Sequence, residues 1–161
     1  AERVLEGLLI LSASAGCDGM VGGQVMDLAN ENRSLTAEEL DAINWRKTGA
    51  LFRASAGIGC VLGGGTGSER EAAERYAGDV GLAFQIVDDL LDVTADQEQL
   101  GKPVGSDAEN NKNTYAALLG LDACRKRVEE LNANAKAALG QLPGDTGLLA
   151  ELVDRLAVRN F

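Results

Sequence analysis

The sequence predicts an all-α protein, and three observations lead to that prediction. Apolar residues recur three and four positions apart through most of the 161 residues, which is the period of an amphipathic helix. Sustained alternation of apolar and polar residues, the mark of a strand, is absent from the sequence, and aromatic residues make up only 4% of it. Glycine-rich and polar breaks divide the chain into segments of helical length. We therefore expect helices that pack on one another.

The chain begins with an apolar segment. Residues Glu2–Ala15 carry apolar side chains on nearly all sides, which is typical of a buried helix. The glycines of Gly16–Gly23 interrupt this helix, and a short second helix through Gln24 and Asp27 follows.

Local signals mark the next turn and helix. Residues Asn30–Ser34 are polar and typical of a turn. Thr36 and Glu39 form a capping box, in which each side chain accepts a hydrogen bond from the other residue's backbone N–H, so a helix is predicted to begin there. We expect it to run to about Cys60, before the glycines of Gly63–Gly67 break the chain again.

A long helix and a polar loop come next. Ser68 with Glu71 repeats the capping-box pattern and predicts the start of a helix over Glu69–Thr94. Lysines, a proline and glycines within Ala95–Asn113 predict a loop.

The last part of the chain is again helical in pattern. A helix is predicted from near Thr114 to about Leu142, with a bend at Gly120. Pro143–Gly147 is the last predicted connection, and Leu148–Arg159 closes the chain as a short helix.

Composition excludes several classes of function. The 25 acidic and 15 basic residues give a net charge of −10, which repels nucleic acid and anionic membranes. Because the sequence has no histidine, Ser-His-Asp and Cys-His nucleophiles and histidine-ligated metals cannot form. We expect no membrane span, since no apolar run approaches the ~18 residues that a span needs. Three scattered cysteines are typical of reduced core thiols in a cytoplasmic protein: Cys17, Cys60 and Cys124.

Four polar residues of the long predicted helix share one face. Gln85, Asp88, Asp89 and Asp92 fall within an arc of about 100°, opposite the apolar residues of the same segment. One interpretation is a solvated acidic face. The other is a half-buried site for a hard divalent cation such as Mg²⁺, which binds one or two carboxylates and completes its shell with water and phosphate oxygens. A di-iron bundle site would need Glu-x-x-His pairs that this sequence lacks.

Three more sets of polar residues each have two interpretations, one purely structural and one functional. Gln24 and Asp27 either reflect the preference for acidic residues near the start of a helix or form a second set of ligands for a metal or substrate. Lys47 is a lysine whose stem packs on apolar neighbours, or a phosphate ligand if it faces the aspartates. Lys102 and Lys112 belong to an ordinary polar loop, or supply positive charge beside the acidic helix. Taken together, the four sets describe Mg²⁺ and lysines around a diphosphate.

Four segments, in this order, resemble the C-terminal half of the trans-isoprenyl diphosphate synthases, the farnesyl and geranylgeranyl diphosphate synthase family. They are GMVGGQVMDLA, RKTGALF, FQIVDDLLDVT and LGKPVGSDAENNKNTY. The resemblance implies a helical bundle of the isoprenoid synthase type and Mg²⁺-dependent condensation of isopentenyl diphosphate with an allylic diphosphate. It also implies a homodimer.

The resemblance implies roles for individual residues. Asp88 is similar to a direct Mg²⁺ ligand, Asp89 and Asp92 to residues that hold its waters, and Asp27 to a supporting carboxylate for the other ions. Lysines similar to those that grip the allylic diphosphate, or close over it, are Lys47, Lys102 and Lys112. The other implied substrate contacts are Gln24, Thr48 and Gln85, the last two of which turn oxygens toward the developing cation.

One departure from the family is large. The family's first aspartate-rich motif, which binds the remaining Mg²⁺ ions, has no match in this sequence. We therefore expect residues 1–161 to form the C-terminal part of one isoprenoid-synthase helical domain and to be inactive alone. Two alternatives stay open: a non-catalytic truncated subunit or partner of an intact synthase, and a terpene cyclase of the same fold.

Overall fold

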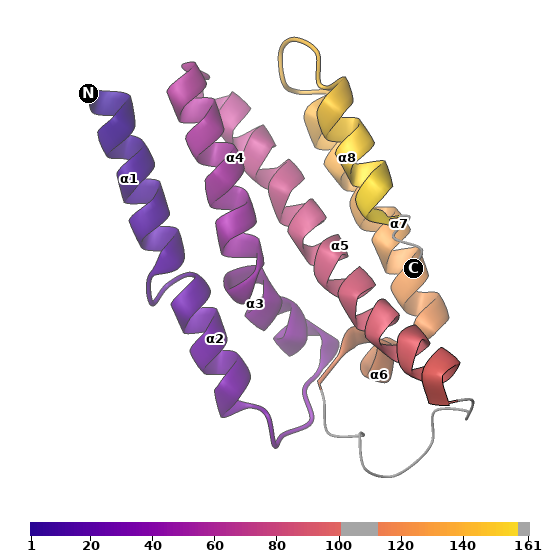
Figure 1. The fold of residues 1–161 in the computed structure, drawn as a ribbon. Coiled ribbons are helices and arrows are strands. Elements are labelled where there is room, and N and C mark those ends of the chain that lie inside the picture. The colour runs from indigo at the N-terminus through magenta and orange to yellow at the C-terminus, as the bar shows by residue number, and fades with distance from the viewer. Residues whose placement is uncertain (101–112, 158–161) are drawn as a thin grey trace.

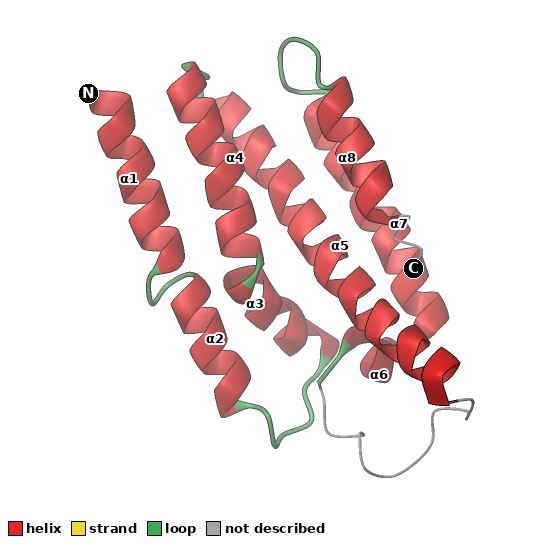
Figure 2. Cartoon of the chain, viewed as in Figure 1, coloured by secondary structure: helices red, strands yellow, loops and turns green. Residues whose placement is uncertain are grey.

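Helices make up nearly all of the structure, a computed structural model that describes residues 1–100 and 113–157 (Figure 1). No strand occurs within those ranges (Figure 2), so the all-α prediction is confirmed. The helices in these ranges are α1 Glu2–Ala15, α2 Met20–Ala29, α3 Ala37–Lys47, α4 Gly49–Gly63, α5 Gly67–Leu100, α6 Tyr115–Leu119, α7 Leu121–Leu139 and α8 Gly147–Ala157.

The 34-residue α5 runs through the middle of the bundle. Helix α4 packs along one side of it and α7 along another, while α1 packs on α4 and α8 on α7 (Figure 1). Helices α2, α3 and α6 gather at the end of the bundle where α5 ends. The polar segments that the sequence singled out on α2, α3 and α5 therefore share one end of the molecule.

Two apolar clusters hold α5 in the bundle. The first lies around the C-terminal half of α5 and joins it to α3, α6 and α7, with Ile43, Ile86 and Tyr115 at most 1% exposed. The second lies around the N-terminal half and joins α5 to α7 and α8, with Tyr76 and Val153 buried. Helix α5 is thus packed on several sides between Tyr76 and Leu91.

The predicted helix from Thr36 to Cys60 is two helices in the structure. Its start is confirmed, because the Glu39 N–H donates to the Thr36 hydroxyl at 3.2 Å and the Thr36 N–H donates to the Glu39 carboxylate at 2.9 Å. Thr48 lies between α3 and α4 with φ −108° and ψ −51°, and its hydroxyl donates to Gln85 of α5. Thr48 is β-branched and Gly49 follows it, and both residue types have a low helix propensity. The helix is interrupted at this position, where the Thr48 side chain contacts Gln85.

The start of α5 lies two residues before the predicted one. The Glu69 N–H donates to the Thr66 hydroxyl at 3.3 Å, and the Thr66 N–H donates to the Glu69 carboxylate at 2.5 Å. The predicted cap at Ser68 with Glu71 is therefore wrong. Both pairs fit the capping-box spacing, and the one nearer the preceding glycines forms.

The end of α5 and the break at Gly120 both differ from the prediction. Helix α5 continues to Leu100, although the sequence predicted a loop from Ala95, because the run ADQEQL is rich in helix-forming residues. The rest of the predicted loop, residues 101–112, lies outside the described residues. Gly120 has φ +81° and divides α6 from α7, so the predicted bend is a break between two helices.

The first two helices expose a broad apolar surface. The sequence predicted a buried helix over Glu2–Ala15, and this is wrong, since Gly7, which faces Ile58 of α4, is its only buried residue. We call the exposed set the α1–α2 apolar surface; its members are 46–61% exposed and are Val4, Leu5, Leu8, Leu9, Leu11, Val21, Val25 and Leu28. An apolar helix predicts burial without saying what covers it.

The same stretch corrects the expectation that no apolar run is long enough for a membrane. By length and composition, the segment Glu2–Ala29 is apolar enough to cross a membrane. An 18-residue window within it has a mean hydropathy of 1.5, and 11% of that window is buried in the structure. The structure divides this stretch into α1 of 14 residues and α2 of 10 residues. A spanning helix needs about 20 residues. The described part of the chain thus contains no clear membrane span.

The three cysteines differ in their surroundings. Cys124 is buried, and burial raises the pKa of its thiol, as expected for a core residue. Cys60 is partly exposed and Cys17 is exposed, so the expectation of core thiols is wrong for Cys17. The cytoplasmic location stays a prediction.

Candidate functional site

Lys47 meets Asp27 where α2 crosses the end of α3. The lysine Nζ lies 2.5 Å from the Asp27 Oδ2, and each side chain is 35% exposed. Gly23 makes this crossing possible, because a Cβ at that position would lie 2.2 Å from the backbone nitrogen of Lys47. The glycine before Gln24 therefore brings the two helices to backbone contact, which any other residue would prevent.

Thr48 and Gln85 connect α3 and α4 to α5. The Thr48 hydroxyl donates to the Gln85 Oε1 at 3.2 Å, and the Gln85 Nε2 donates to the Asp89 Oδ1 at 3.3 Å. These bonds join Thr48, the residue after Lys47, to the C-terminal half of α5.

Both oxygens of Asp89 accept hydrogen bonds. Its Oδ2 accepts from the backbone N–H of Tyr115 at 2.8 Å, at the start of α6. Burial raises the pKa of Asp89, although the bonds from Tyr115 and Gln85 act in the opposite direction, and the neighbouring Asp92 and Asp88 raise it further. The inward position of this carboxylate is thus stabilised by α6.

The other two aspartates of the predicted acidic face lie differently. Asp88 is partly buried, and Asp92 is exposed. They are one turn of α5 apart. The solvated-face interpretation fits Asp92, and the cation-site interpretation stays a prediction. Asp89, like Asp88, is partly buried, whereas Asp92 faces solvent.

The remaining predicted residues lie at the margin of this site or beyond the described residues. Gln24 is exposed on α2, one turn before Asp27. Lys102 and Lys112 lie within 101–112, outside the described residues.

Sequence reasoning missed a second layer behind Asp89. The phenol of Tyr115, which is 1% exposed, donates to the Asp41 Oδ1 at 2.7 Å, and Arg127 of α7 lies 3.2 Å from the Asp41 Oδ2. Asn44 is a polar side chain that is buried in the described part of the chain, and it contacts the same phenol. The spacing of Asp41, Asn44 and Thr48, three and then four residues apart, was the available signal, because it places them on one helix face.

Residues 8–154 match the model of one protein family, polyprenyl synthetase. The chain belongs to the polyprenyl synthetase family. It is 39% identical over 160 residues to the farnesyl diphosphate synthase of Bacillus subtilis (strain 168), covering 99% of this chain and 54% of that relative. It is 41% identical over 161 residues to a chloroplastic geranylgeranyl pyrophosphate synthase of Capsicum annuum, covering 99% and 44%.

Solved structures of such enzymes share the fold of this polyprenyl synthetase chain. An FPP/GFPP synthase from Zymomonas mobilis has a TM-score of 0.82 and 31% identity, over 98% of this chain and 51% of that one. A geranyltransferase from Helicobacter pylori, complexed with magnesium and isoprenyl diphosphate, has a TM-score of 0.76 and 32% identity, over 97% and 51%. The expected bundle of the isoprenoid synthase type is thus confirmed, and the chain spans about half the length of the relatives that it matches.

The donors on this polyprenyl synthetase chain fit Mg²⁺ better than softer metals. Within residues 1–100 and 113–157, no three acidic or cysteine side chains form a preassembled metal cage. Asp88 and Asp92 offer carboxylate oxygens one turn apart, and the sequence has no histidine. Mg²⁺ characteristically binds one or two protein carboxylates and takes its other ligands from water and phosphate. The residues present therefore fit this ion.

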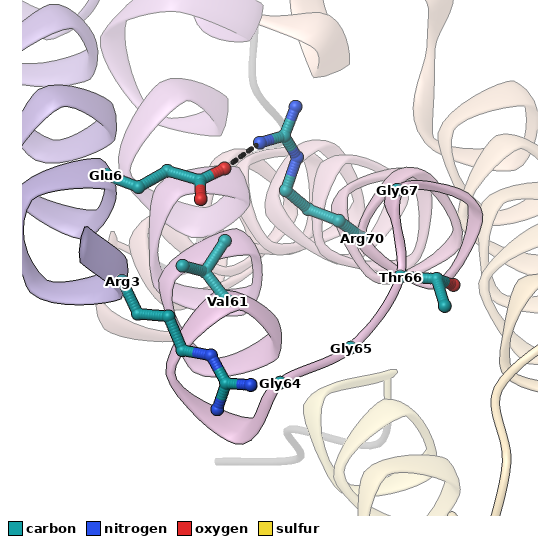
Figure 3. A pocket seen from close by; sticks show the side chains of 8 residues that line it. All are labelled: Arg3, Glu6, Val61, Gly64, Gly65, Thr66, Gly67 and Arg70. Atoms are coloured by element: carbon teal, nitrogen blue, oxygen red, sulfur yellow. Dashed lines mark hydrogen bonds and ion pairs between the residues drawn. The ribbon is translucent and has the colours of Figure 1, made fainter.

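A polar pocket of about 130 Å³ lies at the opposite end of α4, between α1 and the start of α5 (Figure 3). Arg70 reaches across it to Glu6 at 2.8 Å and also lies 3.4 Å from Glu74. Helix α4 has 15 residues, so at 1.5 Å per residue the pocket is roughly 20 Å from Thr48. Because it lies this far from Thr48 and its Arg70 is paired with Glu6, we do not assign it to the diphosphate site.

Proposed function

We propose that the protein to which this chain contributes is a Mg²⁺-dependent prenyltransferase that condenses isopentenyl diphosphate with an allylic diphosphate. The observation that carries the proposal is the corner formed by Lys47, Thr48 and Gln85 next to the acidic face of α5. The printed names of its relatives, farnesyl diphosphate synthase and geranylgeranyl pyrophosphate synthase, support this reaction class.

The reaction needs a stabilised leaving group and a protected cation. When the allylic C–O bond breaks, negative charge develops on the diphosphate, and positioned cations stabilise it. We assign this role to Lys47, together with Lys102, and closure over the diphosphates to Lys112. Lys47 exchanges its partner Asp27 for the diphosphate, which its 35% exposure allows. The oxygens of Thr48 and Gln85 face the developing allylic cation, and Gln24 contributes at the rim.

Mg²⁺ is the cofactor that this proposal requires. Asp88 and Asp92 would hold it, with Asp27 as a supporting carboxylate, and when bound it neutralises diphosphate charge as a Lewis acid. Such a cation would lie between the acidic residues and the polyanionic substrate and offset their repulsion.

The chain alone is proposed to be inactive. It spans about half of its relatives, and it lacks a match to the family's first aspartate-rich motif. We expect no longer prenyl diphosphate when the chain is incubated with isopentenyl diphosphate, geranyl diphosphate and Mg²⁺. Turnover at the rate of full-length relatives would contradict this expectation.

A homodimer is the proposed assembly. The α1–α2 apolar surface consists of large apolar side chains that are 46–61% exposed, and contiguous exposed apolar patches mark protein interaction sites. A second copy of the chain supplies a matching apolar surface by symmetry.

Pyrophosphate binding tests the proposed function. Titration calorimetry of the chain with inorganic pyrophosphate is expected to show binding in Mg²⁺ and none in EDTA. Lys47→Met keeps the apolar stem but removes the charge, and it should weaken binding at least tenfold, because a charge-assisted bond is worth about 1.5–3 kcal/mol. The matched control is Lys126→Met on the exposed face of α7, which should leave binding unchanged. Equal binding by both variants would overturn the proposal.

A further inference from the structure

We propose that Asp89 and Asp41 are positioning residues, which act through Gln85 and Tyr115 to fix the orientation of the Gln85 amide against Thr48. The inference rests on the proposed function and deepens it, because it divides the acidic face into a part that meets the ligand and a part that holds the site. A continuous series of hydrogen bonds carries it.

The series has a fixed direction. A carboxylate only accepts hydrogen bonds, so the group of Gln85 that faces Asp89 at 3.3 Å must be its NH₂. The amide oxygen of Gln85 then faces Thr48, whose hydroxyl donates to it at 3.2 Å. Rotating the amide by half a turn would place two acceptors against each other at Asp89, which is why Asp89 decides which end of Gln85 meets the ligand.

Asp89 is itself held by α6. Its second oxygen accepts from the Tyr115 backbone N–H at 2.8 Å, so each oxygen of Asp89 accepts one hydrogen bond from within the protein. On α5 it lies about 100° around the helix from Asp88, at the edge that faces α6. Asp88 and Asp92 are the carboxylates that the proposed function assigns to the cation.

The series closes on itself through α3. The Tyr115 phenol donates to Asp41 at 2.7 Å, and Asp41 is paired with Arg127 of α7 at 3.2 Å. Asp41 and Thr48 lie seven residues apart, at the two ends of one helix face. Movement of α3 relative to both α5 and α6 would therefore strain the bond at Thr48 and the bond at Asp41. This ring sets where the neighbouring Lys47 lies relative to α5.

The first test compares two neighbouring aspartates. Asp88→Asn and Asp89→Asn remove the same charge from adjacent positions of α5, so the general electrostatic effect is matched. In the calorimetric titration with Mg²⁺ and inorganic pyrophosphate, we expect Asp88→Asn to weaken binding at least tenfold and Asp89→Asn to weaken it less than threefold. Equal tenfold losses would overturn the inference and leave the proposed function standing. Absence of Mg²⁺-dependent binding by the unsubstituted chain would overturn both.

The second test follows the Gln85 side chain itself. The NH₂ resonances of Gln85 in an ¹⁵N spectrum, assigned with Gln85→Glu, should shift in Asp89→Asn and also in Tyr115→Phe, which removes only the phenol oxygen. Arg125→Gln, which removes an exposed guanidinium two residues from Arg127, is the control and should leave them in place. Unshifted Gln85 resonances in folded Tyr115→Phe would show that the ring does not position this amide.

Discussion

At the scale of single residues, small side chains decide where the polar ones lie. Gly23 has no Cβ, and α2 therefore approaches α3 closely enough for Asp27 to meet Lys47. The sequence contained this information as a glycine before Gln24, but only the close contact explains it.

Gly23→Ala tests this contact. A Cβ 2.2 Å from the Lys47 backbone nitrogen forces α2 and α3 apart, so we expect the free energy of unfolding to fall by about 1–3 kcal/mol. The matched control is Gly59→Ala in α4, whose Cβ meets nothing within 4 Å and should gain up to about 1 kcal/mol in helix propensity. Urea unfolding followed by circular dichroism measures both. A stabilising Gly23→Ala would contradict the close crossing.

Asp79 on α5 predicts a pH dependence of stability. Burial raises its pKa above the usual 3.8, with Arg127 acting in the opposite direction. The folded state then binds a proton more tightly than the unfolded chain, so the contribution of Asp79 to stability is lost as pH rises from 3.8 through the raised pKa. We therefore expect Asp79→Asn to raise the free energy of unfolding above that of the unsubstituted chain, and this gain should be larger at pH 7 than at pH 4. Urea unfolding at both pH values measures it. The opposite order would contradict the burial of Asp79.

At the scale of helices, local signals locate the ends of an element less well than its existence. The capping box at Thr36 was predictable because nothing nearby competes with it. Thr66 and Ser68 both fit the pattern before α5, and the choice between them depends on the turn that follows α4. The break at Thr48 could not be predicted from propensity alone, since it depends on Gln85, which is 37 residues away.

Substitution of both candidate caps tests the start of α5. Thr66→Ala removes the side-chain oxygen that accepts from the Glu69 N–H and should cost about 1 kcal/mol of unfolding free energy. Ser68→Ala removes the hydroxyl at the position that the sequence favoured and should cost no more than a few tenths of a kcal/mol. Thermal unfolding compares the two, and a larger loss for Ser68→Ala would restore the sequence-based boundary.

At the scale of the whole molecule, the all-α bundle followed from helical periodicity. The four linked motifs named Asp27 with Lys47 and Thr48 with Gln85, which the structure brings into contact. The contact between Tyr115 and Asp41 could not be predicted in this way, because it joins residues 74 positions apart and helical periodicity describes only residues close in sequence. The exposure of α1 could not be predicted either. An apolar helix has the same sequence pattern whether other helices of the chain or a partner molecule cover it.

The α1–α2 apolar surface predicts self-association. In sedimentation velocity the chain should form dimers or larger species, and Leu5→Asp with Leu9→Asp should shift it to monomer, because these side chains are 60% and 61% exposed. The matched control is Leu148→Asp on α8, which is 79% exposed and lies outside this surface. A monomeric unsubstituted chain, or equal dissociation by Leu148→Asp, would contradict the assignment of the surface.

The most direct measurement is binding of an allylic diphosphate to the chain with and without Mg²⁺. Calorimetry with geranyl diphosphate should show saturable binding in Mg²⁺, loss of binding in EDTA, and at least tenfold weaker binding by Lys47→Met. These results would place the acidic face of α5 and the lysine at the end of α3 in one diphosphate site. Binding that is the same in EDTA, or unchanged in Lys47→Met, would contradict that account.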